Sequence, residues 1–302
     1  AAPPERRAEL EERHGAAARA LTMRADAANA AWEAHIDAAR ARLRRHDDEL
    51  LRAEGDGFLA KVGKSVGQLG AVADLSRRGL TPQDMVVAAT LLRTAPELDG
   101  VKALILSGNQ LGGAGITALA DAAAHGALRH VERLFLDNVA LTDDALGELA
   151  AVLAAGAMPS LAFLDVTRNQ IGDRGMAALA QAMRGGALAR LTTLYAYNNR
   201  LGSAGVSALV EGLCEGAAPP ALEKLYLDNN GVRDDGVAVL ARAIEGGRLP
   251  ALKVLHLGGN PAPREMVEAV EGMIGGPARG APQTSDLELP PAGGDVTPSD
   301  IV

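Results

Sequence analysis

The 302-residue sequence is poor in two residue types that often mark a functional site, cysteine and the aromatic residues. Cys214 is its single cysteine, so no disulfide can form within the chain and no cysteine-rich zinc site is expected. Tryptophan, tyrosine and phenylalanine make up 2% of the residues, so their few positions are informative. The sequence also lacks an apolar run of about 18 residues, the length that a membrane-spanning helix needs, and we expect no membrane insertion.

The charge of the chain excludes a further class of partner. The formal net charge is −8, which argues against nucleic acid, because phosphate recognition needs a concentrated basic surface. No N-x-S/T glycosylation site is present, which favours an intracellular location. The sequence begins Ala1-Ala2-Pro3-Pro4 without a methionine. We expect a cytoplasmic protein, or an organellar one after removal of a targeting segment, unless the sequence starts inside a longer chain.

An internal repeat dominates the rest of the sequence. The pattern L-x-x-L-x-L-x-x-N-x-L-G-x-x-G-x-x-A-L-A recurs every 30 or 31 residues. Such a period, kept in register, is typical of proteins built from stacked modules. Positions are numbered from the first residue of each repeat, and the seven repeats begin at Gly70, Val101, Val131, Leu161, Leu191, Leu222 and Leu252.

Each repeat is predicted to contain one short strand and one helix. Positions 4 and 6 are apolar with a variable residue between them, as in Leu104 and Leu106, which indicates a strand with one buried face. Position 9 is an asparagine in five repeats, and its short amide can bond the backbone where the chain turns off the strand. Apolar residues then return at helical spacing, and a glycine near the helix start, such as Gly175, lets neighbouring helices pack closely.

These repeats resemble the long, helix-containing leucine-rich repeats of the ribonuclease-inhibitor class, which also occur in NOD-like receptors and in the Ran GTPase activator. The resemblance covers Gly70 to Gly275, about two thirds of the chain. It implies an α/β leucine-rich-repeat solenoid, a horseshoe with a parallel sheet inside and helices outside. It implies much less about function, because this fold carries many unrelated binding partners.

The repeats divide the chain into four predicted segments. Residues 1–56 are expected to form a long N-terminal helix that the sequence Gly55-Asp56-Gly57 ends, and residues 57–69 a capping segment for the first repeat. Residues 70–275 are the solenoid of seven repeats. Residues 276–302 are rich in proline, glycine, serine and aspartate, and we expect a flexible tail there.

The predicted N-terminal helix carries one narrow apolar stripe. Leu10, Leu21, Trp32 and Leu43 are eleven residues apart, and Ile36 falls on the same side. This period fits an almost straight helix. One interpretation is a docking or coiled-coil arm anchored by Trp32. The other is a helix that folds back on its own solenoid or is simply solvated, and the sequence leaves both open.

The rare aromatic residues fall on one side of the predicted strands. Positions 2, 3, 5, 7 and 8 should face the concave surface and solvent, and five of the seven aromatic residues occupy such positions. Exposed aromatic side chains on a rigid sheet are frequent anchors of protein interfaces. High β-propensity and packing between strands are the alternative explanation. The predicted partner-binding residues of this face are Phe135, Phe163, Asp165, Tyr195, Tyr197, Tyr226, Asp228 and His256.

The sequence shows no arrangement that indicates catalysis, a metal site or a cofactor. The histidines lack a cysteine or carboxylate at metal-binding or nucleophile spacing. We therefore predict a non-enzymatic scaffold that binds a protein partner on the concave face. A second partner at the N-terminal helix and membership of a larger assembly are further expectations. A GTPase-activating or ribonuclease-inhibitor-like regulator is the alternative that the resemblance leaves open.

Overall fold

The computed structural model describes residues 34, 37–38, 41–216 and 221–274, and the chain divides into two compact units between Ala53 and Glu54. The described residues of the first unit are helical. In the second unit residues 54–62 are helical, and Gly63 follows in a left-handed conformation. The predicted helix end at Gly55 to Gly57 is therefore wrong. A glycine costs a helix only about 1 kcal/mol, and burial of Phe58 and Val62 in this turn of helix outweighs that cost.

Seven short parallel strands form one sheet, and their order in the sheet follows their order in the chain. Val72 pairs with Ala103, and Ala103 with Arg133. Thr193 pairs with Lys224 across a second interval of 31 residues. The register of the sheet thus reproduces the spacing predicted from the sequence. The strands are β1 (Val72–Asp74), β2 (Ala103–Ile105), β3 (Arg133–Phe135), β4 (Phe163–Asp165), β5 (Thr193–Tyr195), β6 (Lys224–Tyr226) and β7 (Val254–His256).

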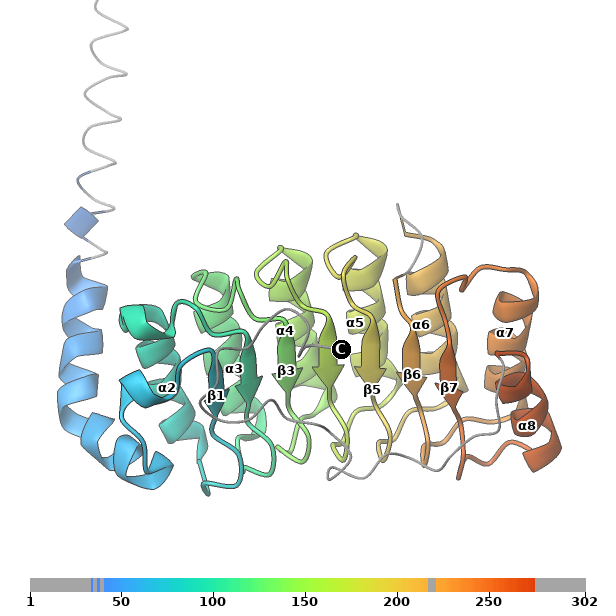
Figure 1. Ribbon diagram of the computed structural model, residues 1–302, viewed down its shortest axis with the longest axis horizontal. Coiled ribbons are helices and arrows are strands. Elements are labelled where there is room, and N and C mark those ends of the chain that lie inside the picture. Colours follow the sequence, from blue (N-terminus) through green and yellow to red (C-terminus); the bar gives the residue numbers. More distant parts are fainter. Residues whose placement is uncertain (1–33, 35–36, 39–40, 217–220, 275–302) are drawn as a thin grey trace, which may run out of the picture. The chain divides into compact units, whose positions relative to one another are not determined.

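A helix follows each strand, and the helices lie on one side of the sheet (Figure 1). The middle residue of each strand points toward them, as in Leu134, Leu164 and Leu194, which have no exposed surface. This open sheet alternating with helices confirms the predicted α/β solenoid. The helices are α2 (Pro82–Thr94), α3 (Gly112–Ala124), α4 (Asp143–Ala154), α5 (Asp173–Arg184), α6 (Ser203–Cys214), α7 (Asp234–Glu245) and α8 (Arg264–Gly272), with short 3-10 turns η1 (Val66–Gln68) and η2 (Pro96–Leu98).

The asparagines at position 9 tie each repeat to the preceding one. Asn169 is buried, and its Oδ1 accepts hydrogen bonds from the amides of Val139 at 3.1 Å and Leu141 at 2.9 Å. Its Nδ2 donates to the carbonyl oxygens of Leu136 at 2.7 Å and Val166 at 2.9 Å. These side chains satisfy backbone groups that the turn would otherwise leave unpaired. The structural role predicted for this position is confirmed, with similar bonds made by Asn109, Asn199, Asn230 and Asn260.

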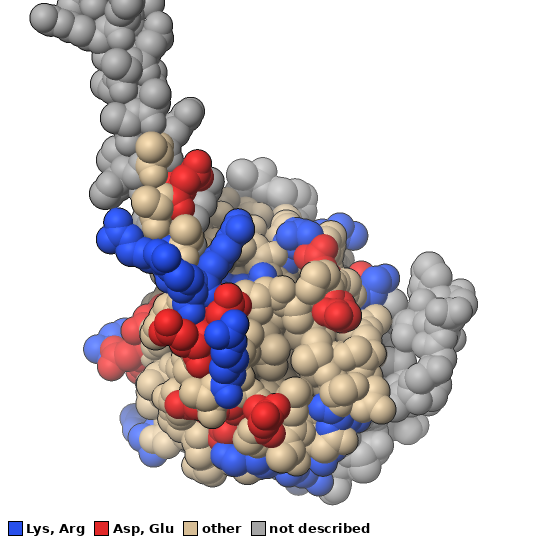
Figure 2. Space-filling model, turned by 90° about the vertical axis from the view of Figure 1, so that its left-hand side faces the viewer, with Lys and Arg blue, Asp and Glu red and all other residues tan. Residues whose placement is uncertain are grey.

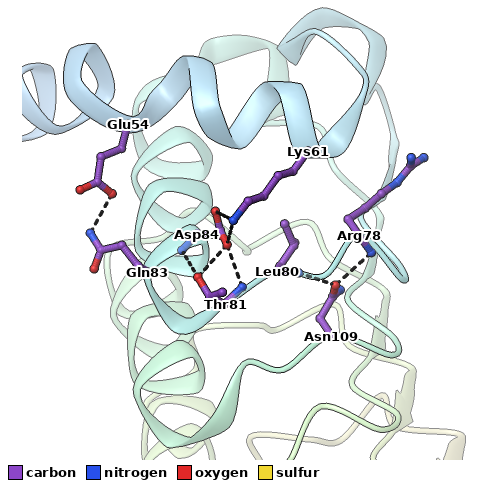
Figure 3. Close-up of polar contacts among 8 residues, drawn as sticks. All are labelled: Glu54, Lys61, Arg78, Leu80, Thr81, Gln83, Asp84 and Asn109. Carbon is purple, nitrogen blue, oxygen red and sulfur yellow. Dashed lines mark hydrogen bonds and ion pairs between the residues drawn. The ribbon is translucent and has the colours of Figure 1, made fainter.

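Helical residues 54–62 are joined to the first repeat by polar contacts (Figure 3). Lys61 Nζ lies 2.8 and 2.7 Å from the two carboxylate oxygens of Asp84, and Gln83 Nε2 donates to Glu54 Oε2 at 2.9 Å. Asp84 Oδ2 also accepts from the Thr81 amide at 2.8 Å, which caps α2. Burial alone would raise the pKa of Asp84, but the hydrogen bonds from Lys61 and Thr81 lower it. Residues 54–62 are thus held to α2 by an ion pair and a hydrogen bond.

Candidate functional site

One side of the sheet is covered by none of the helices α2 to α8 (Figure 1), and we call it the helix-free face. Position 5 points to this face, because positions 4 and 6 on either side point into the core. The sheet register places position-5 residues side by side, pairing Phe135 with Asp165 and Asp165 with Tyr195. Tyr226 and His256 continue this row in β6 and β7. Residues far apart in the sequence therefore form one continuous surface.

Five rings from five consecutive strands touch one another on the helix-free face. The centroid distances are 4.8 Å for Phe135 to Phe163 and 5.1 Å for Phe163 to Tyr195. They are 4.4 Å for Tyr195 to Tyr226 and 4.6 Å for Tyr226 to His256. These separations are those of attractive ring pairs. We call the five residues the ring ladder; Tyr197 lies beside it, 6.3 Å from Tyr195.

The predicted solvent exposure of these rings is wrong for most of them. Phe135 is 2% exposed, Tyr197 3%, and Tyr195 and His256 8%, whereas Phe163 and Tyr226 are partly exposed. Neighbouring strands are about 4.8 Å apart, so large side chains in adjacent strands cover one another. The packing between strands that the sequence offered as an alternative is therefore present. Burial also raises the pKa of Tyr195, Tyr197 and Tyr226, so their hydroxyl groups remain protonated.

Two aspartates of this face are buried with incompletely paired carboxylates. Asp165 has no exposed surface; its Oδ1 accepts from the Thr167 amide at 2.9 Å, and its Oδ2 has no hydrogen-bond partner among the described residues. Burial raises its pKa to about 7. Asp228 is 5% exposed, and its Oδ1 accepts from the Gly258 amide at 3.1 Å. Its Oδ2 likewise finds no partner in the described part of the chain, and burial raises its pKa, against the opposing effect of His256.

The edge of the helix-free face carries charges of both signs. Lys253 Nζ lies 2.9 Å from Glu223 Oε1, and Lys224 is exposed beside them. The Arg133 guanidinium lies 5.3 Å from the Phe135 ring and 5.4 Å from the Phe163 ring. Figure 2, which views the molecule from the left-hand side of Figure 1, likewise shows both acidic and basic side chains on the surface that faces the viewer. Neither the edge of the helix-free face nor the surface seen in Figure 2 therefore carries charge of one sign only.

The sequence missed two residues that complete this region. Thr167 follows Asp165 at position 7 and is 1% exposed, and Glu271 on α8 accepts from the Leu257 amide at 2.6 Å. Burial raises the pKa of Glu271. Thr167 could have been found from the position-7 column, which also holds the predicted Tyr197 and Asp228. Glu271 could not have been found in this way, because it lies on α8 and not at one of the repeated strand positions.

The predicted residues of the N-terminal helix are mostly outside the described part of the structure. Leu10, Leu21, Trp32 and Ile36 fall there, so their grouping stays a prediction. Leu43 is described, and its side chain is 44% exposed. Within the described residues, no group of three histidine, cysteine or carboxylate side chains is placed to hold a metal ion. None of the described helices is both long and apolar enough to cross a membrane.

A comparison with protein families identifies the kind of repeat. A family model described as Leucine Rich repeat matches residues 101–120 and 157–180. Both segments fall within repeats that the sheet arranges side by side. The matched segments are leucine-rich repeats. The predicted membership of the ribonuclease-inhibitor class within this family stays a prediction, and no curated protein matches the sequence.

Two of the solved structures that are similar to this chain have low sequence identity to it. A Bacteroides fragilis protein is 13% identical, with a TM-score of 0.46; the match covers 74% of this chain and 70% of that one. Internalin C2 from Listeria monocytogenes is 22% identical, with a TM-score of 0.35; the match covers 67% of this chain and 91% of that one. The description of the site therefore depends on this chain's own residues.

Proposed function

We propose that this leucine-rich-repeat protein is a non-enzymatic scaffold that binds a protein partner on the helix-free face, over strands β3 to β7. The observation that carries the proposal is the ring ladder, five contacting rings on the face that none of the helices α2 to α8 covers. Rings held by their neighbours lose little freedom on binding, which lowers the entropic cost of an interface. Phe163 and Tyr226, the two partly exposed members, would make the direct contacts, with Lys224 and Lys253 at the edge.

The role of the rings in partner binding is tested by replacing the two that are partly exposed, Phe163 and Tyr226. Full-length protein with Phe163→Ser and Tyr226→Ser is used to capture and cross-link proteins from the native source, beside the wild type. We expect about tenfold less of the partner, because central aromatic contacts carry much of an interface's free energy. Phe135 and Tyr195 are left unchanged, since their burial would make the variant unstable. Unchanged capture by a folded variant contradicts the proposal.

A charge reversal on each side of the sheet supplies a matched control. Lys253 on the helix-free face and Arg174 on α5 are both exposed, and each pairs with a carboxylate of the preceding repeat, at 2.9 Å and 2.5 Å. Exposed pairs contribute less than about 1 kcal/mol to stability, so both variants should fold. We expect Lys253→Glu to weaken capture and Arg174→Glu to leave it unchanged. Equal effects of the two would place the partner elsewhere.

The N-terminal helix is proposed as a second docking element, supported by the exposure of Leu43. The residues from Glu54 onward form a separate compact unit, so a chain that starts there should retain the partner of the helix-free face. We expect this shortened chain, and Leu43→Glu in the full chain, to lose a different set of cross-linked proteins. If neither loses any, the helix is not a docking element.

A further inference from the structure

Asp165 and Asp228 are buried with one oxygen each that is unpaired in the described part of the chain, and the fold does not require an aspartate at the position of Asp165. At position 5, where β4 has Asp165, β2 has Ile105 and β3 has Phe135, both buried. A carboxylate in this place costs stability, because burial without a full set of partners disfavours its charged form. Each aspartate leaves one buried oxygen without a partner among the described residues. A buried polar group without a partner calls for an explanation, and a ligand that completes its hydrogen bonds supplies one.

The surroundings of Asp165 favour a positively charged ligand. Asp165 lies in register between Phe135 and Tyr195, and the Phe163 ring is within 4.8 and 5.1 Å of both flanking rings. Ring faces attract cations, and Arg133 already places its guanidinium over two rings of this cluster. A carboxylate with a free oxygen next to aromatic rings offers a guanidinium both a charge-assisted hydrogen bond and a stacking surface.

We propose that Asp165, with the rings around it, binds an arginine side chain supplied by the protein partner. This inference rests on the proposed function and names the chemistry of the partner's contact. A planar guanidinium can donate to Asp165 Oδ2 while it stacks on a ring, which a metal ion cannot do. The Phe163 ring, partly exposed and in contact with both flanking rings, must turn aside to admit it.

A short peptide tests the chemistry without the partner. The probes are acetyl-Gly-Arg-Gly-amide and the same peptide with citrulline, which has the shape of arginine but no charge. Binding to the full chain at pH 8 is followed by nuclear magnetic resonance of the tyrosine rings. We expect the arginine peptide to bind about tenfold more tightly than the citrulline peptide. Equal binding of the two peptides overturns the proposal.

Asp74 provides the matched control for Asp165. It holds position 5 in β1, but its Oδ1 already accepts from the Ser76 amide at 3.0 Å and hydroxyl at 2.7 Å. We expect Asp165→Asn to lose the preference for arginine and Asp74→Asn to keep it. A preference that survives in Asp165→Asn, or is lost equally in both variants, contradicts the proposal.

The wild type supplies a measurement that needs no folded variant. Asp165 is faced by Asp137 after β3, Arg168 after its own strand, Tyr195 at the end of β5 and Tyr197 just after it. Protonation of Asp165 below pH 7 should weaken binding of the arginine peptide by up to about tenfold per pH unit. Binding that is constant between pH 5.5 and 8 overturns the proposal.

Capture of the partner separates this proposal from the proposed function. If Phe163→Ser with Tyr226→Ser releases the partner and Asp165→Asn also weakens it, both are supported. If the ring variants release the partner and Asp165→Asn holds it as the wild type does, the face binds a protein but the arginine contact is wrong. If no variant of the helix-free face affects capture, the proposed function fails, and the arginine contact fails with it.

Discussion

The two sides of the sheet follow different rules. On the helix side, position 4 is leucine from the second repeat to the seventh, and position 9 is asparagine in five repeats. On the helix-free face, position 5 holds Asp74, Ile105, Phe135, Asp165, Tyr195, Tyr226 and His256 in turn. The helix side is uniform because each repeat must fit its neighbours in the same way. The other side is free of that requirement, so it is where individual residues can serve binding.

The largest difference between the two sides is expected in the pH dependence of the free energy of unfolding, because of Asp165. Its folded-state pKa, about 7, lies above the ordinary value of 3.8. Between pH 4 and 7 the folded protein therefore keeps a proton that the unfolded chain releases, so stability falls as pH rises through this window and levels off above it. The integrated loss is on the order of 4 kcal/mol.

In the Asp165→Asn variant the side chain cannot ionise, so its stability should not show this decrease between pH 4 and 7. Urea unfolding of the variant and the wild type from pH 4 to 8 measures it, and the variant should gain relative stability as pH rises. Asp228 and Glu271, whose pKa values are also raised, act in the same direction in both proteins and cancel in the difference. Parallel profiles for the two proteins would mean that Asp165 ionises normally in the folded state.

A smaller loss of stability is expected when Asn169, a residue of the repeated pattern, is replaced. Replacing Asn169 with valine leaves the amides of Val139 and Leu141 and the carbonyl oxygens of Leu136 and Val166 without their partner. At roughly 1 kcal/mol for each buried group, with some relaxation, we expect a loss of about 3 kcal/mol. Chemical denaturation measures it. The neighbouring Gln170 is exposed, and Gln170→Ala should change stability by less than about 0.5 kcal/mol.

The difference between the two sides explains how far the sequence could predict the structure. Leu164 and Asn169 belong to a pattern that fixes the strand, the turn and the register together, so the order and spacing of seven strands could be derived from it. The register also placed Phe135, Asp165 and Tyr195 in one row. Both results follow from backbone geometry, which all repeats share.

Burial on the helix-free face could not be predicted in the same way, because it depends on the sizes of neighbouring side chains. Asp165 is short and lies between two large residues, and Phe163 from the same strand contacts both Phe135 and Tyr195. An unpaired oxygen such as Asp165 Oδ2 likewise appears only when all neighbours are placed. The error at Gly55 to Gly57 has a similar cause, since a local glycine signal was outweighed by burial of Phe58 and Val62.

The smallest predicted effects concern two helical glycines and test whether uniformity on the helix side reflects contact between repeats. A Cβ atom at Gly205 in α6 would lie 3.0 Å from the Cα of Asp173 in the preceding repeat, so Gly205→Ala should cost about 1–3 kcal/mol. A Cβ atom at Gly147 in α4 would meet nothing within 4 Å. Gly147→Ala should therefore stabilise the protein by about 0.5–1 kcal/mol, because alanine favours a helix. Thermal unfolding at one pH compares them, and shifts of the same sign would show that close packing of the helices does not fix this position.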